Sequence, residues 1–198
     1  MKPILIDLPQ EITTTRLLLR PPMPGDGVVI NEAIIESFDD IKEWLPWATH
    51  IPTVEETEET TRIRHIKWLN REDLGLLIFD RQTGQYLGGV GFPRMDWYVP
   101  KFEVGYWLRS SQVGKGIVSE AVNACVRFAF LELKAKKIEL KCDSKNEKSI
   151  KVAKSLGFNL EAHLKLDSMT PDKKEIRDLL IFTRYNLENL PSLEVNWT

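Results

Sequence analysis

Cysteine is scarce in this sequence of 198 residues, which contains only Cys125 and Cys142. Cys125 lies in an apolar helical pattern and Cys142 in an apolar strand pattern. Free cysteine in such surroundings behaves as a small buried hydrophobe, and disulfides are concentrated in secreted proteins. We therefore expect two buried thiols rather than a disulfide.

An excess of one charge and long apolar runs are also missing. The 27 Lys and Arg residues are nearly balanced by 29 Asp and Glu residues, which gives a net charge of −2. Binding to phosphate backbones needs a basic excess, so we expect no direct nucleic-acid partner. No apolar run is long enough to span a bilayer, and the first residues become polar and acidic by Asp7, without a signal-peptide core. The sequence predicts a cytoplasmic protein with no membrane partner.

Histidine is rare as well. The three histidines, His50, His65 and His163, are scattered, and no metal-ligand spacing joins them to one another or to the cysteines. The sequence therefore predicts no metal site.

The pattern that is present predicts one α/β domain over residues 1–198, with its core at about 14–185. Apolar residues recur at helical spacing after Asp26 and again after Thr53, where Glu56 completes a capping box. The tail after Asn186 carries few structural signals and is expected to be loosely held. The expected elements are a strand at 14–20, helices after 26 and after 53, strands at 74–79, 86–92 and 102–108, a helix from 117 to about 133, a strand at 137–142, a helix at 147–156, and strands at 158–166 and 176–185.

The stretch from Val104 to Ile117 is the most informative. A strand pattern ends in a short polar turn that contains Gly114 and Gly116, and a long apolar helix pattern follows. Glycine lets the backbone approach a ligand closely, and the first helical turn offers unpaired N–H groups backed by the helix dipole. The stretch predicts a site for a phosphate-bearing ligand, while an ordinary turn is the alternative explanation of the two glycines.

Two common phosphate-binding patterns do not fit this stretch. The Walker pattern would need glycine at Arg109, and the dinucleotide pattern would need glycine at Ser119. The stretch instead resembles the acyl-coenzyme A pyrophosphate loop of the GNAT acetyltransferases, (Gln/Arg)-x-x-Gly-x-(Gly/Ala). Gly114 and Gly116 match its glycines, whereas its first position is Ser111, with a glutamine one place late.

This resemblance covers about residues 14–185 and implies the GNAT fold: a central, mixed, mostly antiparallel sheet with two splayed parallel strands and about four helices. It implies an N-acetyltransferase that moves the acetyl group of acetyl-CoA to a primary amine, without a metal. Backbone N–H groups of residues 113–117 would hold the pyrophosphate, and the main chain of residues 107–109 would pair with the pantetheine arm. The cofactor-binding residues implied are Trp107, Leu108, Arg109, Val113, Gly114, Lys115, Gly116, Ile117, Asn146 and Ser149.

The resemblance also suggests catalytic residues. Many family members carry a tyrosine acid at the position of Ala153, and Ser149, one turn earlier on the same helix face, is the substitute in the Rim-type branch. An exposed helix serine is the alternative. Glu103 is the expected general base, because a carboxylate that accepts the amine's proton raises the rate. The alternative is a carboxylate paired with a nearby cation, and Glu161 and Asp167 are weaker candidates.

The acceptor is suggested by the Trp44-Leu45-Pro46-Trp47 cluster and by residues 104–108, which look like those of the Rim-type ribosomal-protein N-terminal acetyltransferases. That likeness implies direct attack by the N-terminal α-amino group of a ribosomal or other protein, at a site bordered by Trp44, Trp47 and Tyr106. A small amine (an antibiotic, a polyamine or an amino-acid derivative) and a non-catalytic acetyl-CoA-binding protein remain open. Acidic residues at 55–59 would attract a basic partner, although a solvated helix face is favoured. This branch often forms dimers, so a homodimer is one expected state.

Overall fold

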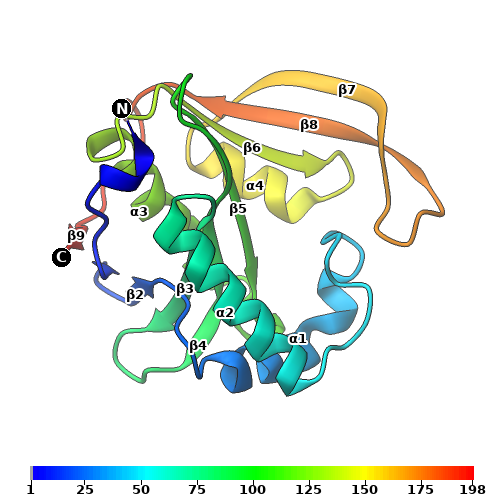
Figure 1. Ribbon diagram of the computed structural model, residues 1–198. Helices are drawn as coiled ribbons and strands as arrows, with labels where there is room; N and C mark the ends of the chain where they lie inside the picture. The colour runs from blue at the N-terminus through cyan, green and yellow to red at the C-terminus, as the bar shows by residue number, and fades with distance from the viewer. Residues whose placement is uncertain (1) are drawn as a thin grey trace.

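The computed structural model describes residues 2–198. Within them, nine strands form one open sheet in the order β7-β8-β6-β5-β4-β3-β2-β1-β9, with four α-helices packed against it (Figure 1). The strands are β1 (Ile12–Thr13), β2 (Leu17–Arg20), β3 (Leu74–Asp80), β4 (Tyr86–Asp96), β5 (Lys101–Leu108), β6 (Lys137–Asp143), β7 (Asn159–Met169), β8 (Ile176–Arg184) and β9 (Asn196–Trp197). The helices are α1 (Gly27–Ile41), α2 (Val54–Asn70), α3 (Ile117–Leu131) and α4 (Glu147–Ser155), with short 3-10 turns η1 (Pro3–Leu5) and η2 (Ser110–Gln112). The predicted fold class is confirmed.

Two apolar cores lie on opposite faces of the sheet. The larger core packs α3 and α4 against inward-facing residues of β3 to β6 and β8, and Phe102, Val104 and Ile138 are among its buried members. The smaller core packs α1 against Leu77 and Phe79 of β3 and residues near them. Because successive side chains of a strand point to opposite faces, one strand supplies both cores.

Strands β5 and β6 are the parallel pair that positions the candidate site. Their ladder holds only three pairs, of which the last joins Glu103 to Glu139. Beyond that pair β5 continues beside β4, and β6 continues beside β8. Figure 1 shows the two strands separating after a common start. The predicted splay of two parallel strands is therefore present.

The glycines of β4 allow its neighbouring strands to approach closely. A Cβ on Gly88 would lie 2.3 Å from the carbonyl oxygen of Trp107, and one on Gly91 would lie 2.2 Å from that of Leu74. The register between β4 and β5 also shifts between Gly91 and Arg94. This packing holds β5 in place beside the point where it separates from β6.

Two expectations about the ends of the chain were wrong. The strand expected from Thr14 begins only at Leu17, because the Thr14 hydroxyl accepts the N–H of Leu17 and closes a turn after β1. The tail is not loose. Leu190 is buried, and β9 pairs with β1.

Both cysteines are buried free thiols, as expected, and burial raises the pKa of Cys125 to about 12. None of the helices formed by residues 2–198 has the length and apolar content needed to cross a membrane.

Candidate active site

The glycine loop joins β5 to α3 and leaves backbone donors free at the start of the helix. Gly114 and Gly116 have positive φ angles of 84° and 76°, a conformation that favours glycine, and no atom lies within 4 Å of a Cβ placed on Gly114. Within the described chain, the N–H groups from Gly114 to Ser119 have no acceptor. The N–H of Val113 is already used by Ser110, at 3.2 Å. Of the donors predicted at 113–117, all but that of Val113 are therefore free, and those of Val118 and Ser119 are free as well.

Helix α1 anchors the beginning of this loop. Glu36 accepts the N–H of Ser111 at 3.0 Å and the Nε–H of Arg109 at 2.8 Å. The hydroxyl of Ser37 accepts the N–H of Ser110 at 3.0 Å. Hydrogen bonding to Ser111 holds the pKa of Glu36 below its ordinary value, so the carboxylate is ionised at neutral pH. Arg109, predicted to contact a cofactor, thus has a structural partner.

The turn after β1 supports the other side of the loop. The Arg16 guanidinium donates to the carbonyl oxygen of Lys115 at 3.0 Å and to the Glu120 carboxylate at 2.7 Å. Lys115 itself donates to the side chain of Gln112 at 2.9 Å. The loop therefore carries two nearby cations as well as free amides, a combination suited to an anion.

The gap between β5 and β6 begins beyond the Glu103–Glu139 pair. Residues 104–108 of β5 pair only with β4, so the edge that faces β6 has no strand partner. Such an edge can bond to an extended ligand that carries amide groups. Leu108 and Trp107 lie at its far end, next to the glycine loop.

Tyr106 and Ser149 meet across this gap. The phenolic hydroxyl of Tyr106 donates to the Ser149 hydroxyl oxygen at 3.1 Å. Asn146, predicted to bind the cofactor, caps α4 by accepting the N–H of Ser149 at 3.0 Å. Burial raises the pKa of Tyr106, so its hydroxyl remains protonated. Ala153, at the position of the missing tyrosine acid, is fully buried in the same helix.

An aromatic wall lies on the opposite face of the sheet. Trp47, from the loop between α1 and α2, packs edge to face on Trp107 with 5.8 Å between ring centroids, and Tyr86 packs on Trp107 at 6.0 Å. Trp47 is half-exposed. Trp44 is partly buried and does not take part in these ring contacts. Of the predicted acceptor residues, Trp47 therefore lies beside β5, whereas Tyr106 faces the other side of the sheet.

Glu103 lies where the gap opens, on the face of the aromatic wall. Its two carboxylate oxygens pair with Arg94 at 2.6 Å and with Lys141 at 3.0 Å. Lys141 also contacts Glu139, at 3.2 Å. Glu103 is thus a carboxylate paired with two cations, which is the alternative that the sequence left open.

The two weaker candidates for the base lie on β7. Glu161 pairs with Lys137 at 2.8 Å and accepts the Tyr185 hydroxyl at 2.6 Å, and these contacts lower its pKa to about 2. Asp167 is exposed near the end of the same strand. Neither strand position borders the gap, because β8 separates β7 from β6.

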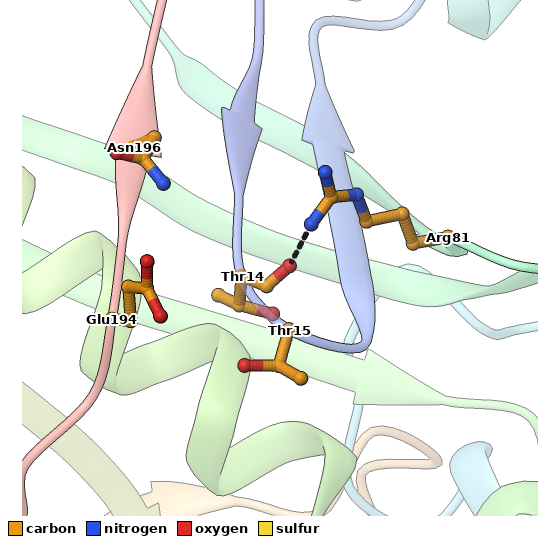
Figure 2. Close-up of a pocket in the computed structure, with 5 residues that line it drawn as sticks. All are labelled: Thr14, Thr15, Arg81, Glu194 and Asn196. Atoms are coloured by element: carbon orange, nitrogen blue, oxygen red, sulfur yellow. Dashed lines mark hydrogen bonds between the residues drawn. The ribbon is translucent and has the colours of Figure 1, made fainter.

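A small depression of about 180 Å³ lies elsewhere, along β1 and β9. Figure 2 shows its five lining residues, with Arg81 donating to the carbonyl oxygen of Thr14 at 3.0 Å. None of the predicted site residues lines it. Across residues 2–198, no three His, Cys, Asp or Glu side chains are grouped in a way that could hold a metal ion.

Several functional contacts were missed from the sequence. The hydrogen bonds of Glu36 and Arg16 to the glycine loop join segments that are far apart in the chain, so no local sequence pattern predicts them. The separation of Tyr106 from Trp107 could have been found, because adjacent strand residues point to opposite faces.

Comparisons with known proteins agree with this geometry. The model of the acetyltransferase (GNAT) domain matches residues 16–159. YdaF of Bacillus subtilis (strain 168), which carries a provisional name as a ribosomal N-acetyltransferase, is 32% identical over 152 residues, covering 75% of this chain and 78% of YdaF. A ribosomal-protein-serine acetyltransferase of Escherichia coli (strain K12) is 29% identical over 126 residues, covering 63% of this chain and 70% of that protein.

Solved structures share the fold. RimL, a ribosomal L7/L12 alpha-N-protein acetyltransferase in complex with coenzyme A, superposes with a TM-score of 0.82 at 20% identity, covering 89% of this chain and 97% of RimL. MccE, a microcin C7 self-immunity acetyltransferase in complex with acetyl-CoA and AMP, gives 0.79 at 22% identity, covering 87% and 93% of the two chains. Together with the match over residues 16–159, these findings show that the chain belongs to the GNAT family of acetyltransferases.

Proposed function

We propose that this chain is a single acetyltransferase domain that uses acetyl-CoA to acetylate the N-terminal α-amino group of a protein, with a ribosomal protein as the first candidate. The observation that carries the proposal is the gap between β5 and β6, which has an unpaired strand edge and whose far end lies next to the free amides of the glycine loop.

The residues present fit the cosubstrate. A diphosphate needs donors and positive charge, and the N–H groups from Gly116 to Ser119 supply the donors beside Arg16 and Lys115. The open space around Gly114 leaves room for an anion close to the backbone. Coenzyme A also carries an amide-bearing arm, which the free edge of residues 104–108 can bond in the manner of an added strand. When bound, the cosubstrate supplies an acetyl group as a reactive thioester.

The proposed hydrogen-bond donor to the thioester and the proposed base lie on opposite faces of the sheet. On the face of α4, the Ser149 hydroxyl, which Tyr106 contacts, would donate a hydrogen bond to the thioester sulfur. On the other face, Glu103, which is paired with Glu139 where the gap begins, would accept the amine's proton, directly or through water. Trp47 and Trp107 would border the acceptor and exclude water.

A protein acceptor is supported by the two curated relatives, whose names refer to ribosomal acetylation. The acidic start of α2 contributes less than its composition suggests. Glu56 closes the capping box with Thr53, and Glu58 accepts the N–H groups of Gly25 and Gly27. Only Glu55 and Glu59 of this group are left to attract a basic partner.

A small amine is the second candidate acceptor. MccE, named for immunity to a microcin, has a fold as similar as that of RimL. The two candidates differ in what the loop from Trp44 to Pro52 must accommodate. A non-catalytic acetyl-CoA-binding protein is the third alternative, because the tyrosine acid is missing at Ala153.

An acceptor screen with acetyl-CoA separates these candidates. The protein is mixed with peptides bearing Ser- or Ala-led N-termini, with the same peptides blocked at the α-amino group, and with polyamines and aminoglycosides, and thiol release is followed. We expect release with free N-termini only, and a loss of at least about tenfold in Glu103→Gln with unchanged affinity for coenzyme A. Release with small amines alone would favour the second candidate, and binding without release would favour the third.

A further inference from the structure

A hydrogen bond between Tyr106 and Ser149 crosses the gap, and the roles proposed for Glu103 and Trp47 do not require it. Tyr106 is on β5 and packs toward the larger core, whereas Trp107 packs toward the smaller one. Ser149 lies in the first turn of α4, on the far side of the gap. The bond therefore joins β5, near its end at Leu108, to the helix that follows β6.

The chemistry of the two hydroxyls sets the direction of this bond. A phenol is more acidic than an aliphatic alcohol and is the better donor, so Tyr106 donates and Ser149 accepts. The main chain of Ser149 is fixed at the same time, because its N–H is held by Asn146 at 3.0 Å. Within residues 2–198, the Ser149 hydroxyl proton has no acceptor of its own, so it is available to a ligand.

We infer that Tyr106 is a positioning residue that holds the Ser149 hydroxyl as a hydrogen-bond donor toward the sulfur of the bound thioester, rather than a wall of the acceptor site. The inference rests on the proposed function. In the transfer, the bond from the amine nitrogen to the acetyl carbon forms and the carbon–sulfur bond breaks, with its electron pair passing to sulfur. The amine's proton leaves through Glu103 or water. Ser149 keeps its proton and stabilises the sulfur anion, so neither hydroxyl is consumed.

The direction of the bond predicts a spectroscopic property of the complex with coenzyme A. A hydrogen bond donated to a thiolate favours the ionised form, and a bond of this kind lowers the pKa of the thiol by about one unit. The thiol of bound coenzyme A should therefore ionise at lower pH in the wild-type protein than in Ser149→Ala, by about one unit. Tyr106→Phe should lose about half of this shift, because the serine proton is then free to turn away.

The test combines this titration with kinetics in a double-mutant cycle. Thiolate absorbance of bound coenzyme A and steady-state transfer are measured for the wild-type protein, Tyr106→Phe, Ser149→Ala and the double variant. Tyr98→Phe, at a fully exposed position outside the gap, is the control. We expect Tyr106→Phe to lower kcat about threefold, the equivalent of half a pKa unit, with KM for acetyl-CoA unchanged, and to have no further effect when Ser149→Ala is already present.

The possible outcomes are distinguishable. Equal losses from Tyr106→Phe in both backgrounds, or a wild-type thiol pKa in that variant, would overturn the positioning role while leaving the acetyltransferase proposal intact. Failure of the wild-type protein to bind coenzyme A, or to transfer acetyl groups to any amine, would overturn both. Thermal unfolding of each variant verifies that it is folded.

Discussion

The indole rings of Trp47 and Trp107 meet edge to face, with their centroids 5.8 Å apart. Trp107 is fixed in β5, opposite Gly89 of β4, while Trp47 belongs to the loop that follows α1. The contact joins the strand that borders the gap to the loop expected to receive the acceptor. Because α1 also anchors the glycine loop through Glu36, one helix connects the two halves of the proposed site.

Replacing Trp47 tests the acceptor side of this connection. Trp47→Ala should lower kcat/KM for a peptide acceptor about three- to tenfold, because an aromatic pair contributes about 0.5–1.5 kcal/mol beyond simple burial. Affinity for coenzyme A should be unchanged. Tyr98→Ala removes a fully exposed ring elsewhere and is the matched control. An unchanged kcat/KM in Trp47→Ala would remove Trp47 from the acceptor site.

Replacing Gly114 can be compared with replacing Gly84, a glycine of similar conformation in the loop between β3 and β4. Gly114 and Gly84 both have positive φ, at 84° and 71°, and a Cβ placed on either would meet no atom within 4 Å. Alanine at either position should cost about 1 kcal/mol of unfolding free energy, because the left-handed conformation disfavours a Cβ. Only Gly114→Ala should also weaken coenzyme A binding, by about tenfold, which calorimetry measures directly. Equal affinities in the two variants would argue against a ligand at this loop.

The hydrogen bonds that Glu36 accepts from the glycine loop should support coenzyme A binding. Glu36→Ala frees Ser111 and Arg109 and should weaken coenzyme A binding about fivefold, the equivalent of about 1 kcal/mol for a partly exposed charged hydrogen bond. Glu32→Ala, one turn earlier on the same helix and also exposed, should have no effect.

The contribution of Glu36 to the stability of the folded protein should depend on pH, because its pKa is lowered. A carboxyl group whose pKa is lowered in the folded state stabilises that state above its ordinary value, 4.5, and the stabilisation is lost as the pH falls through the lowered value. The difference in unfolding free energy between Glu36→Ala and the wild-type protein should therefore be constant from pH 8 to 5 and should shrink at lower pH. A difference that disappears near pH 7 would contradict this.

The C-terminal tail should contribute to stability. Removing residues 187–198 takes away the buried side chain of Leu190, breaks the β1–β9 pairing and deprives Asn123 and Arg127 of the Pro191 carbonyl. The expected loss is about 3–5 kcal/mol of unfolding free energy, from one buried leucine and several hydrogen bonds. Removing residues 2–5 is the control, since η1 buries no side chain. Urea unfolding measures both, and losses of similar size would contradict the prediction.

Local signals made most of the fold predictable. The capping box of Thr53 and Glu56, the cap at Asn146 and the glycines at 114 and 116 act on their own neighbours in the chain, so their patterns are visible in the sequence. The strands β1 and β9 were missed because two residues each are too few to show alternation.

The contacts that complete the site could not be predicted in the same way. The Tyr106–Ser149 bond and the Glu36–Ser111 bond join residues whose proximity depends on the packed sheet. The sequence offered Glu103 both as a base and as a paired carboxylate. Its two ion pairs establish the pairing, and the role as a base remains a prediction.

The central claim is that the amides at the start of α3 bind the diphosphate of coenzyme A. Titration calorimetry of the full chain with coenzyme A and, separately, with pantetheine, which lacks the diphosphate and nucleotide, tests it most directly. We predict that coenzyme A binds and that pantetheine binds at least about a hundredfold more weakly, because it lacks the charged groups that those donors and the adjacent cations recognise. Equal affinities for the two molecules, or no binding of coenzyme A, would contradict the claim.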